Sequence, residues 1–289
     1  MIYLKNGRNV NGKKLEILIE EEIIETISID SEKNIGRMIK GRDNIREIDL
    51  EGKILMPGII DIHTHMREPG ITAKEDFETG SRACARGGIT TFYDMPNTVP
   101  TTTTLEALRR KKELACKKSI VNFGFHFGGS RNNNIGEIKK ILSKGEGNTV
   151  KIFMNVTTGE MLIEDDDMLK EIFKNSGLVL VHAENEMIDK ALDLNRKYGK
   201  GIYICHIPSE EELRKVIDAK KDRLFNNKMH PVYAEVTPHH LFLNEEIRDS
   251  SERNKMLLRM KPELRSKKDN EFLWKALNDG YIDTIGTDH

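Results

Sequence analysis

The N-terminal part of the chain alternates between apolar and polar side chains. In KLEILIEEEIIETISID, residues 14–30, apolar residues recur at about every second position, and the turn signals KNG and VNG precede this segment. Such alternation is typical of half-buried antiparallel strands. Residues 1–52 are therefore predicted to form a few strands of a small sheet, the N-terminal part of a β-sandwich domain.

From Lys53 onward, short apolar runs alternate with charged segments. We count eight runs, at residues 53–63, 89–95, 120–127, 149–154, 178–184, 201–207, 232–237 and 281–288. Their nearly continuous hydrophobicity is typical of parallel strands that are buried on both faces. Each run is predicted to be one strand.

Two of the segments between these runs have the apolar spacing of amphipathic helices. One carries Leu213, Val216 and Ile217, and the other carries Met187, Ile188, Ala191 and Leu192. Eight strands with helices between them favour an α/β fold, a (β/α)8 TIM-type barrel over residues 53–289 with the small sheet as a satellite. An open α/β sheet is the alternative, but the chain contains no G-x-G-x-x-G and no Walker-type loop.

The sequence stops at GTDH, directly after the eighth run. A barrel normally covers its last strand with a helix, so we expect this chain to be the front part of a longer one. The N-terminal sheet is then expected to lack strands that return from the far end.

Composition narrows the class of partner. Lysine and arginine number 46 against 47 aspartates and glutamates, giving a net charge of −1, which provides no reason to expect a nucleic acid or an acidic membrane. Three cysteines without a CxxC motif suit reduced thiols and a cytoplasmic location. No apolar run approaches the roughly 18 residues that span a bilayer. A small-molecule partner is expected.

Titratable side chains occupy the ends of the predicted strands, which converge on one mouth of a barrel. His63 and His65 are at i and i+2 of a strand, so both point to one face and can reach one ion. Other strands contribute Lys151, His182, His206 and Asp288. A lone histidine at such a place is more often structural, but this set predicts a metal site.

Lys151 lies inside the apolar run TVKIFM, where a buried ammonium group is costly. Its ammonium could reach water at the barrel mouth, or it could pair with a carboxylate. In the third interpretation its amine has reacted with CO2, and the resulting carbamate bridges two metal ions.

Taken together, the motifs resemble the amidohydrolase superfamily and, more narrowly, the class I dihydroorotases of archaea. The motifs are D-x-H-x-H-x-R, K-I-F-M, H-A-E-N, C-H-I-P, E-V-T-P-H-H and G-T-D-H, and the resemblance runs from about Lys53 to His289. It implies reversible, zinc-dependent hydrolysis of the cyclic amide of dihydroorotate to N-carbamoyl-aspartate, the third step of pyrimidine biosynthesis.

The resemblance also implies roles for single residues. Two Zn²⁺ ions per subunit would be bridged by carboxylated Lys151 and a hydroxide, with His63, His65 and Asp288 on the first ion and His182 and His206 on the second. Asp288 would also be the catalytic proton shuttle. Arg67 and Asn97 would hold the substrate carboxylate; by themselves they read as a surface ion pair and a turn residue.

Some features depart from the family pattern or lie outside it. Lys261 and Glu263 in LLRMKPELRS replace an asparagine and a proline, which puts the usual substrate contact of that segment in doubt. His126, His239 and His240 are predicted to be structural or supporting residues, and Asp61 is predicted to orient an imidazole, with a simple strand-end contact as the alternative.

Two alternative functions stay open at this point. One is a sister cyclic amidase, such as a hydantoinase, dihydropyrimidinase or allantoinase. The other is an inactive scaffold homologue, although such homologues lose metal ligands and every expected position is filled here. The resemblance leaves open a homodimer and an association with aspartate carbamoyltransferase.

Overall fold

The computed structural model describes residues 1–157, 161–226 and 230–289. The chain divides into two compact units, Met1–Gly58 and Ile59–His289. The sequence pattern placed this boundary after Gly52. The structure places it later because Lys53 and Leu55 hydrogen-bond to the backbone of Arg8, within the first unit.

The N-terminal unit is a four-stranded sheet in the order β3-β2-β1-β4. Its elements are β1 (Ile2–Arg8), β2 (Lys14–Glu20), β3 (Ile23–Ile29), α1 (Ile35–Met38) and β4 (Arg46–Asp49). Strands β1 to β3 are antiparallel as predicted, whereas β4 pairs with β1 in parallel. Tyr3, Leu18, Ile35 and Ile39 form its small core.

The second unit contains the predicted parallel strands. They are β5 (Ile59–Thr64), β6 (Ile89–Asp94), β7 (Asn122–Phe125), β8 (Phe127–Gly128), β9 (Thr149–Phe153), β10 (Leu178–His182), β11 (Ile202–Ile204), β12 (Val232–Val236) and β13 (Thr284–Ile285). Hydrogen bonds join β5-β6-β7 in one sheet and β8 through β13 in another. The run at residues 120–127, predicted as one strand, is two strands interrupted at His126.

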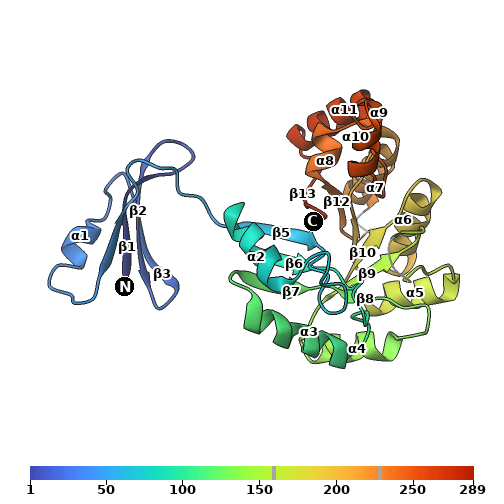
Figure 1. Ribbon diagram of the computed structural model, residues 1–289, viewed down its shortest axis with the longest axis horizontal. Coiled ribbons are helices and arrows are strands. Elements are labelled where there is room, and N and C mark those ends of the chain that lie inside the picture. The colour runs from blue at the N-terminus through green and yellow to red at the C-terminus, as the bar shows by residue number, and fades with distance from the viewer. Residues whose placement is uncertain (158–160, 227–229) are drawn as a thin grey trace. The chain divides into compact units, whose positions relative to one another are not determined.

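Backbone hydrogen bonds close these strands into a barrel. The amide of Asp288 donates to the carbonyl of His63 over 2.9 Å, and the amide of His65 donates to the carbonyl of His289 over 2.7 Å. The segment after β13 therefore lies beside β5, as the converging strands in Figure 1 show. This is the (β/α)8 architecture that the sequence predicted.

Helices fill the connections between the strands. They are α2 (Phe77–Arg86), α3 (Leu105–Lys118), α4 (Ile135–Ser143), α5 (Asp166–Asn175), α6 (Glu186–Tyr198), α7 (Glu210–Asn226), α8 (Pro238–Phe242), α9 (Glu245–Asp249), α10 (Glu252–Leu257) and α11 (Lys267–Asn278). The predicted helical stripes are correct, since Leu213 and Val216 of α7 and Ile188 and Ala191 of α6 are buried. They join the main core with the apolar residues of β9 to β12.

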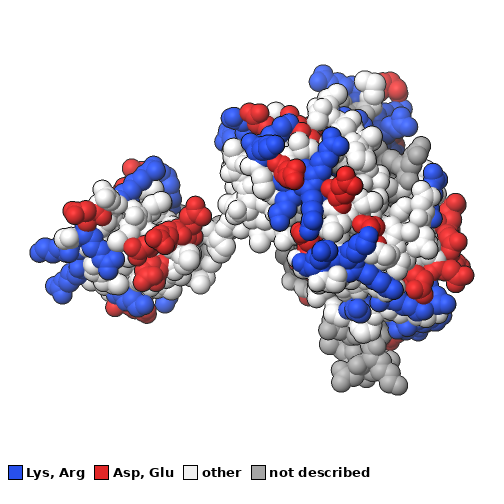
Figure 2. Space-filling model, turned by 90° about the horizontal axis from the view of Figure 1, so that it is seen from below, with Lys and Arg blue, Asp and Glu red and all other residues white. Residues whose placement is uncertain are grey.

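The surface carries both signs of charge. On the face seen in Figure 2, lysine and arginine are interspersed with aspartate and glutamate rather than gathered into one basic surface. In the described part of the chain, no helix has the length and apolar character that a membrane span requires.

Candidate metal centre

Two histidines and an aspartate meet where β5 ends. Strand geometry sends His63 and His65 to the same face, and Oδ1 of Asp288 lies 3.2 Å from Nε2 of His63 and 2.9 Å from Nε2 of His65. Burial raises the pKa of Asp288, but His63 and His65 outweigh it and hold that pKa well below its usual range. The carboxylate is thus ionised and faces two imidazole nitrogens.

His182 and His206 form a second pair at the ends of β10 and β11. Nδ1 of His182 lies 2.9 Å from Nε2 of His206. Burial is the main cause that lowers the pKa of each ring, and that of His206 falls well below its ordinary value. Both rings are therefore neutral, the form in which imidazole binds a metal ion. The other ring nitrogens are buried: Nε2 of His182 lies 3.3 Å from Oε1 of Glu184, and Nδ1 of His206 has no hydrogen-bond partner among the described residues.

Lys151 of β9 is completely buried. Its Nζ donates to Sγ of Cys205 over 2.9 Å and lies 5.1 Å from the centre of the Phe153 ring. Among the described residues, no carboxylate oxygen lies within ion-pair distance of Nζ. The structure therefore does not support the interpretation in which the ammonium pairs with one of the described carboxylates.

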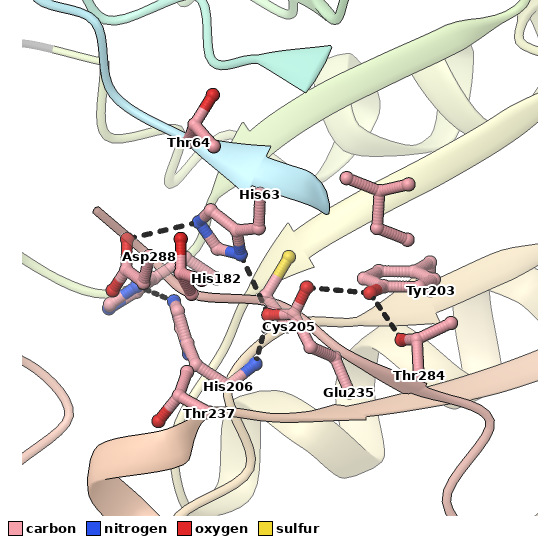
Figure 3. Close-up of polar contacts among 12 residues, drawn as sticks. His63, Thr64, His182, Tyr203, Cys205, His206, Glu235, Thr237, Thr284 and Asp288 are labelled. Atoms are coloured by element: carbon pink, nitrogen blue, oxygen red, sulfur yellow. Dashed lines mark hydrogen bonds and ion pairs between the residues drawn. The ribbon is translucent and has the colours of Figure 1, made fainter. Parts of the chain in front are cut away.

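Glu235 of β12 is a central acid that the sequence reading missed. Its Oε1 lies 2.7 Å from Nδ1 of His63 and accepts the backbone N–H of His206 over 2.8 Å, while Oε2 accepts the hydroxyl of Tyr203 over 2.6 Å. Figure 3 shows these contacts beside the Asp288–His63 pair. The sequence does contain an indication of its importance: Glu235 is a charged residue within the apolar run VYAEV, just as Lys151 is a charged residue within TVKIFM.

One cavity of about 730 Å³ brings the predicted site residues together. It is lined by all of them: His63, His65, Arg67, Asn97, Lys151, His182, His206 and Asp288. Oδ1 of Asn97 lies 2.7 Å from Nδ1 of His65, so Asn97 contacts an imidazole as well as the cavity. Nη1 of Arg67 is buried and has no hydrogen-bond partner among residues 1–157, 161–226 and 230–289.

The segment 259–263 forms another part of the cavity wall. Arg259, Lys261 and Glu263 line it, and Nζ of Lys261 lies 3.3 Å from Oε1 of Glu263. The two departures from the family pattern therefore face the cavity as an ion pair. His240 is structural as predicted, because its ring contacts Thr237 and the carbonyl of Pro262.

Two other predictions have different outcomes. His126 is a packed histidine as predicted: its ring nitrogens contact the hydroxyl of Thr149 and the carbonyl of Ile62, each at 2.8 Å. The prediction that Asp61 orients an imidazole is wrong. Asp61 accepts the backbone amides of His63 and Thr287 and the hydroxyl of Thr287, so it is a strand-end contact that joins β5 to the segment after β13.

The donor set fits a metal ion. Ligand atoms of His63, His206 and Asp288 lie within 4.8 Å of one another, as do those of His63, Cys205 and Glu235. Imidazole and carboxylate are the ligands that Zn²⁺ takes in hydrolytic sites. Nδ1 of His182 and Nε2 of His206, 2.9 Å apart, supply two further imidazole donors at the same end of the barrel.

Comparison with known proteins identifies the protein family that the chain matches. Residues 54–289 match the model of the amidohydrolase family. A dihydroorotase of Methanosarcina mazei is 34% identical over all of this chain and 68% of its own length. A dihydroorotase of Pyrococcus abyssi is 32% identical over 99% of this chain and 66% of its own.

A solved structure gives the same architecture. The L-hydantoinase of Arthrobacter aurescens matches all of this chain and 69% of its own chain at 27% identity, with a TM-score of 0.85. The present chain thus spans about two thirds of the length of the proteins that it resembles.

Proposed function

This chain belongs to the amidohydrolase family, and from that premise we propose that it catalyses the dihydroorotase reaction. In this reaction the cyclic amide of dihydroorotate is hydrolysed reversibly to N-carbamoyl-aspartate. Relatives that carry this activity in their names align with the whole chain at 30–34% identity. The partner of the site is accordingly a small molecule.

One observation carries the choice of substrate. Beside the imidazoles, the cavity holds Arg67, whose Nη1 is buried and has no hydrogen-bond partner in the part of the chain that the structure describes. Leaving such a donor unpaired is costly, and a carboxylate is the group that a guanidinium binds best. Dihydroorotate carries a carboxylate, whereas hydantoin and dihydrouracil do not. The hydantoinase-like fold is thus proposed to serve an anionic substrate.

The proposed metal set follows from the donors. His63, His65 and Asp288 would hold one zinc ion and His182 and His206 the second, with Lys151 carboxylated between them. Among the described residues, no carboxylate forms an ion pair with the Lys151 ammonium, which supports this modification because CO2 addition converts a poorly compensated cation into an anion. Zinc bound there supplies Lewis-acid chemistry: it acidifies water and polarises the amide carbonyl.

The protein side chains would do the rest of the chemistry. Arg67 and Asn97 would bind the carboxylate and fix the ring, which places the scissile amide beside Asp288. Asp288 is ionised and would accept the proton of the attacking water, then deliver it to the leaving amide nitrogen. Glu235 would hold the proton of His63 on Nδ1, which leaves the lone pair of Nε2 free for a metal ion.

A direct assay tests this proposal. The zinc-loaded full-length protein is incubated separately with dihydroorotate, dihydrouracil, hydantoin and allantoin, and ring opening is followed for each. We expect turnover of dihydroorotate to exceed that of the uncharged rings. Preferred turnover of hydantoin or dihydrouracil would instead assign a sister amidase, and no turnover of any ring would favour a scaffold. A homodimer and an association with aspartate carbamoyltransferase stay predictions, which size-exclusion chromatography with and without that enzyme can test.

A further inference from the structure

Helix α3 sends two lysines, seven residues apart and therefore on one face, toward the turn that carries Arg67. Lys111 pairs with Asp94 over 2.5 Å, and both side chains are completely buried. Lys118 pairs with Glu68 over 2.6 Å, and Glu68 is buried as well. None of these four side chains lines the cavity. The proposed chemistry therefore gives them no direct part.

The acids of these ion pairs also accept backbone hydrogen bonds near Arg67. Oδ1 of Asp94 accepts the backbone amide of Met66 over 2.5 Å, and Oε2 of Glu68 accepts the amide of Phe77 over 3.1 Å. Nζ of Lys111 also donates to the carbonyl of Met95 over 2.7 Å. Met66 immediately precedes Arg67, and Met95 lies two residues before Asn97. The buried pair thus joins both segments that present the proposed carboxylate contacts.

Arg67 needs such support because its backbone is strained. Its φ is +59°, the left-handed region that residues other than glycine rarely adopt. Its carbonyl accepts the amide of Ile71 over 2.9 Å, which closes the turn. A strained residue keeps its conformation only when its surroundings hold it. Holding it before the ligand arrives reduces the entropy that binding must overcome.

We propose that Lys111 and Asp94 are positioning residues, which hold Arg67 in the geometry that selects substrates bearing a carboxylate. This inference rests on the proposed function. A buried ion pair is by itself weak evidence of stabilisation, because burial of both charges costs free energy. A purely structural pair would affect folding while leaving ligand selectivity unchanged, so selectivity is the readout that separates the two roles.

The test compares two ligands that differ in one carboxylate. N-Carbamoyl-aspartate and N-carbamoyl-β-alanine are titrated calorimetrically into zinc-loaded wild type and Lys111→Met, and the ratio of their dissociation constants is the selectivity. We expect Lys111→Met to reduce this ratio at least tenfold. Lys111→Arg, which retains charge and donors, should restore most of it.

Lys220→Met is the matched control. Lys220 of α7 also pairs with an aspartate, Asp283, and donates to a backbone carbonyl, that of Tyr281, and like Lys111 it does not line the cavity. Its partners, however, lie outside the two segments that present Arg67 and Asn97. We expect this variant to keep the wild-type ratio. Hydrogen exchange at the Met66 amide gives a readout independent of ligand: it should accelerate at least tenfold in Lys111→Met and stay unchanged in Lys220→Met.

The outcomes separate the two proposals. If wild type discriminates between the ligands and Lys111→Met discriminates equally well, the positioning role is overturned. If wild type does not discriminate, the proposed substrate is wrong; unchanged exchange at Met66 in Lys111→Met would then overturn the positioning role as well. Should Lys111→Met not fold, Asp94→Asn/Lys111→Met leaves no unpaired charge, and the same two measurements decide.

Discussion

Nζ of Lys151 donates a hydrogen bond to Sγ of Cys205 over 2.9 Å, and both side chains are buried. A thiol sulfur is a weak acceptor, so this contact compensates a buried ammonium poorly. A lysine in this place is therefore a candidate for chemistry that removes its positive charge, and carboxylation is the modification that also supplies metal ligands.

Replacing Lys151 by alanine should consequently remove zinc as well as activity. We expect zinc affinity to fall by at least about 100-fold, with partial recovery of zinc and activity when a short carboxylic acid such as propionate fills the space. Bound zinc is measured by mass spectrometry, and activity is measured as turnover of dihydroorotate. Lys139→Ala, an exposed change on α4, is the control. An intact two-metal site in Lys151→Ala would refute the bridging role.

Asp288→Asn tests the proton shuttle. The amide has nearly the same shape as the carboxylate but cannot accept and release the proton, so we expect turnover to fall by roughly 10²–10⁴-fold. Folding and most of the bound zinc should persist, since the histidines remain. Circular dichroism, zinc content and kcat are the measurements, with exposed Asp279→Asn as the control. Undiminished turnover would remove Asp288 from this role.

The strand order of the barrel and most cavity residues could be predicted because their signals are local. Parallel strands buried on both faces leave continuous apolar runs, and residues at their ends share one mouth. The break at His126 could not be predicted. It depends on hydrogen bonds from that ring to Ile62 and Thr149, on two other strands of the barrel.

Partners that are distant in sequence could not be predicted either. Asp61 contacts Thr287, 226 positions along the chain, and Glu235 contacts His63, 172 positions away. An acid within an apolar strand signals a buried partner but does not identify it. Only the closure of the barrel between β5 and the segment after β13 decides that Asp61 supports the strand end while Glu235 contacts the imidazole.

Arg67→Met tests the choice of substrate. Methionine keeps much of the apolar volume of the side chain and removes the guanidinium. A hydrogen bond to a charged group contributes about 1.5–3 kcal/mol, so we expect KM for dihydroorotate to rise roughly 10–150-fold. KM for an uncharged ring such as hydantoin should change little. Equal changes for both substrates would argue for a sister amidase.

The packed histidine His126 should make the free energy of unfolding depend on pH in the acid range. Burial lowers its pKa to about 3, and the hydrogen bond to the carbonyl of Ile62 opposes this shift without reversing it. The unfolded chain takes up this proton near the ordinary pKa of about 6.5. The stabilisation is therefore complete above pH 6.5 and is lost progressively as the pH falls toward 3, because the unfolded state binds the extra proton.

His126→Gln should remove this contribution to the pH dependence. Between pH 6.5 and pH 5 the histidine lowers the unfolding free energy of wild type by about 1.6 kcal/mol, because the slope rises from half of 1.36 kcal/mol per pH unit at pH 6.5 toward the full value. Glutamine has no proton to take up, so the variant should lose less stability over that interval even if it is less stable at pH 7. Urea unfolding of both proteins at pH 7, 6 and 5 gives the two slopes. Parallel slopes would mean that His126 is protonated in the native state or that its burial is relieved before the protein unfolds.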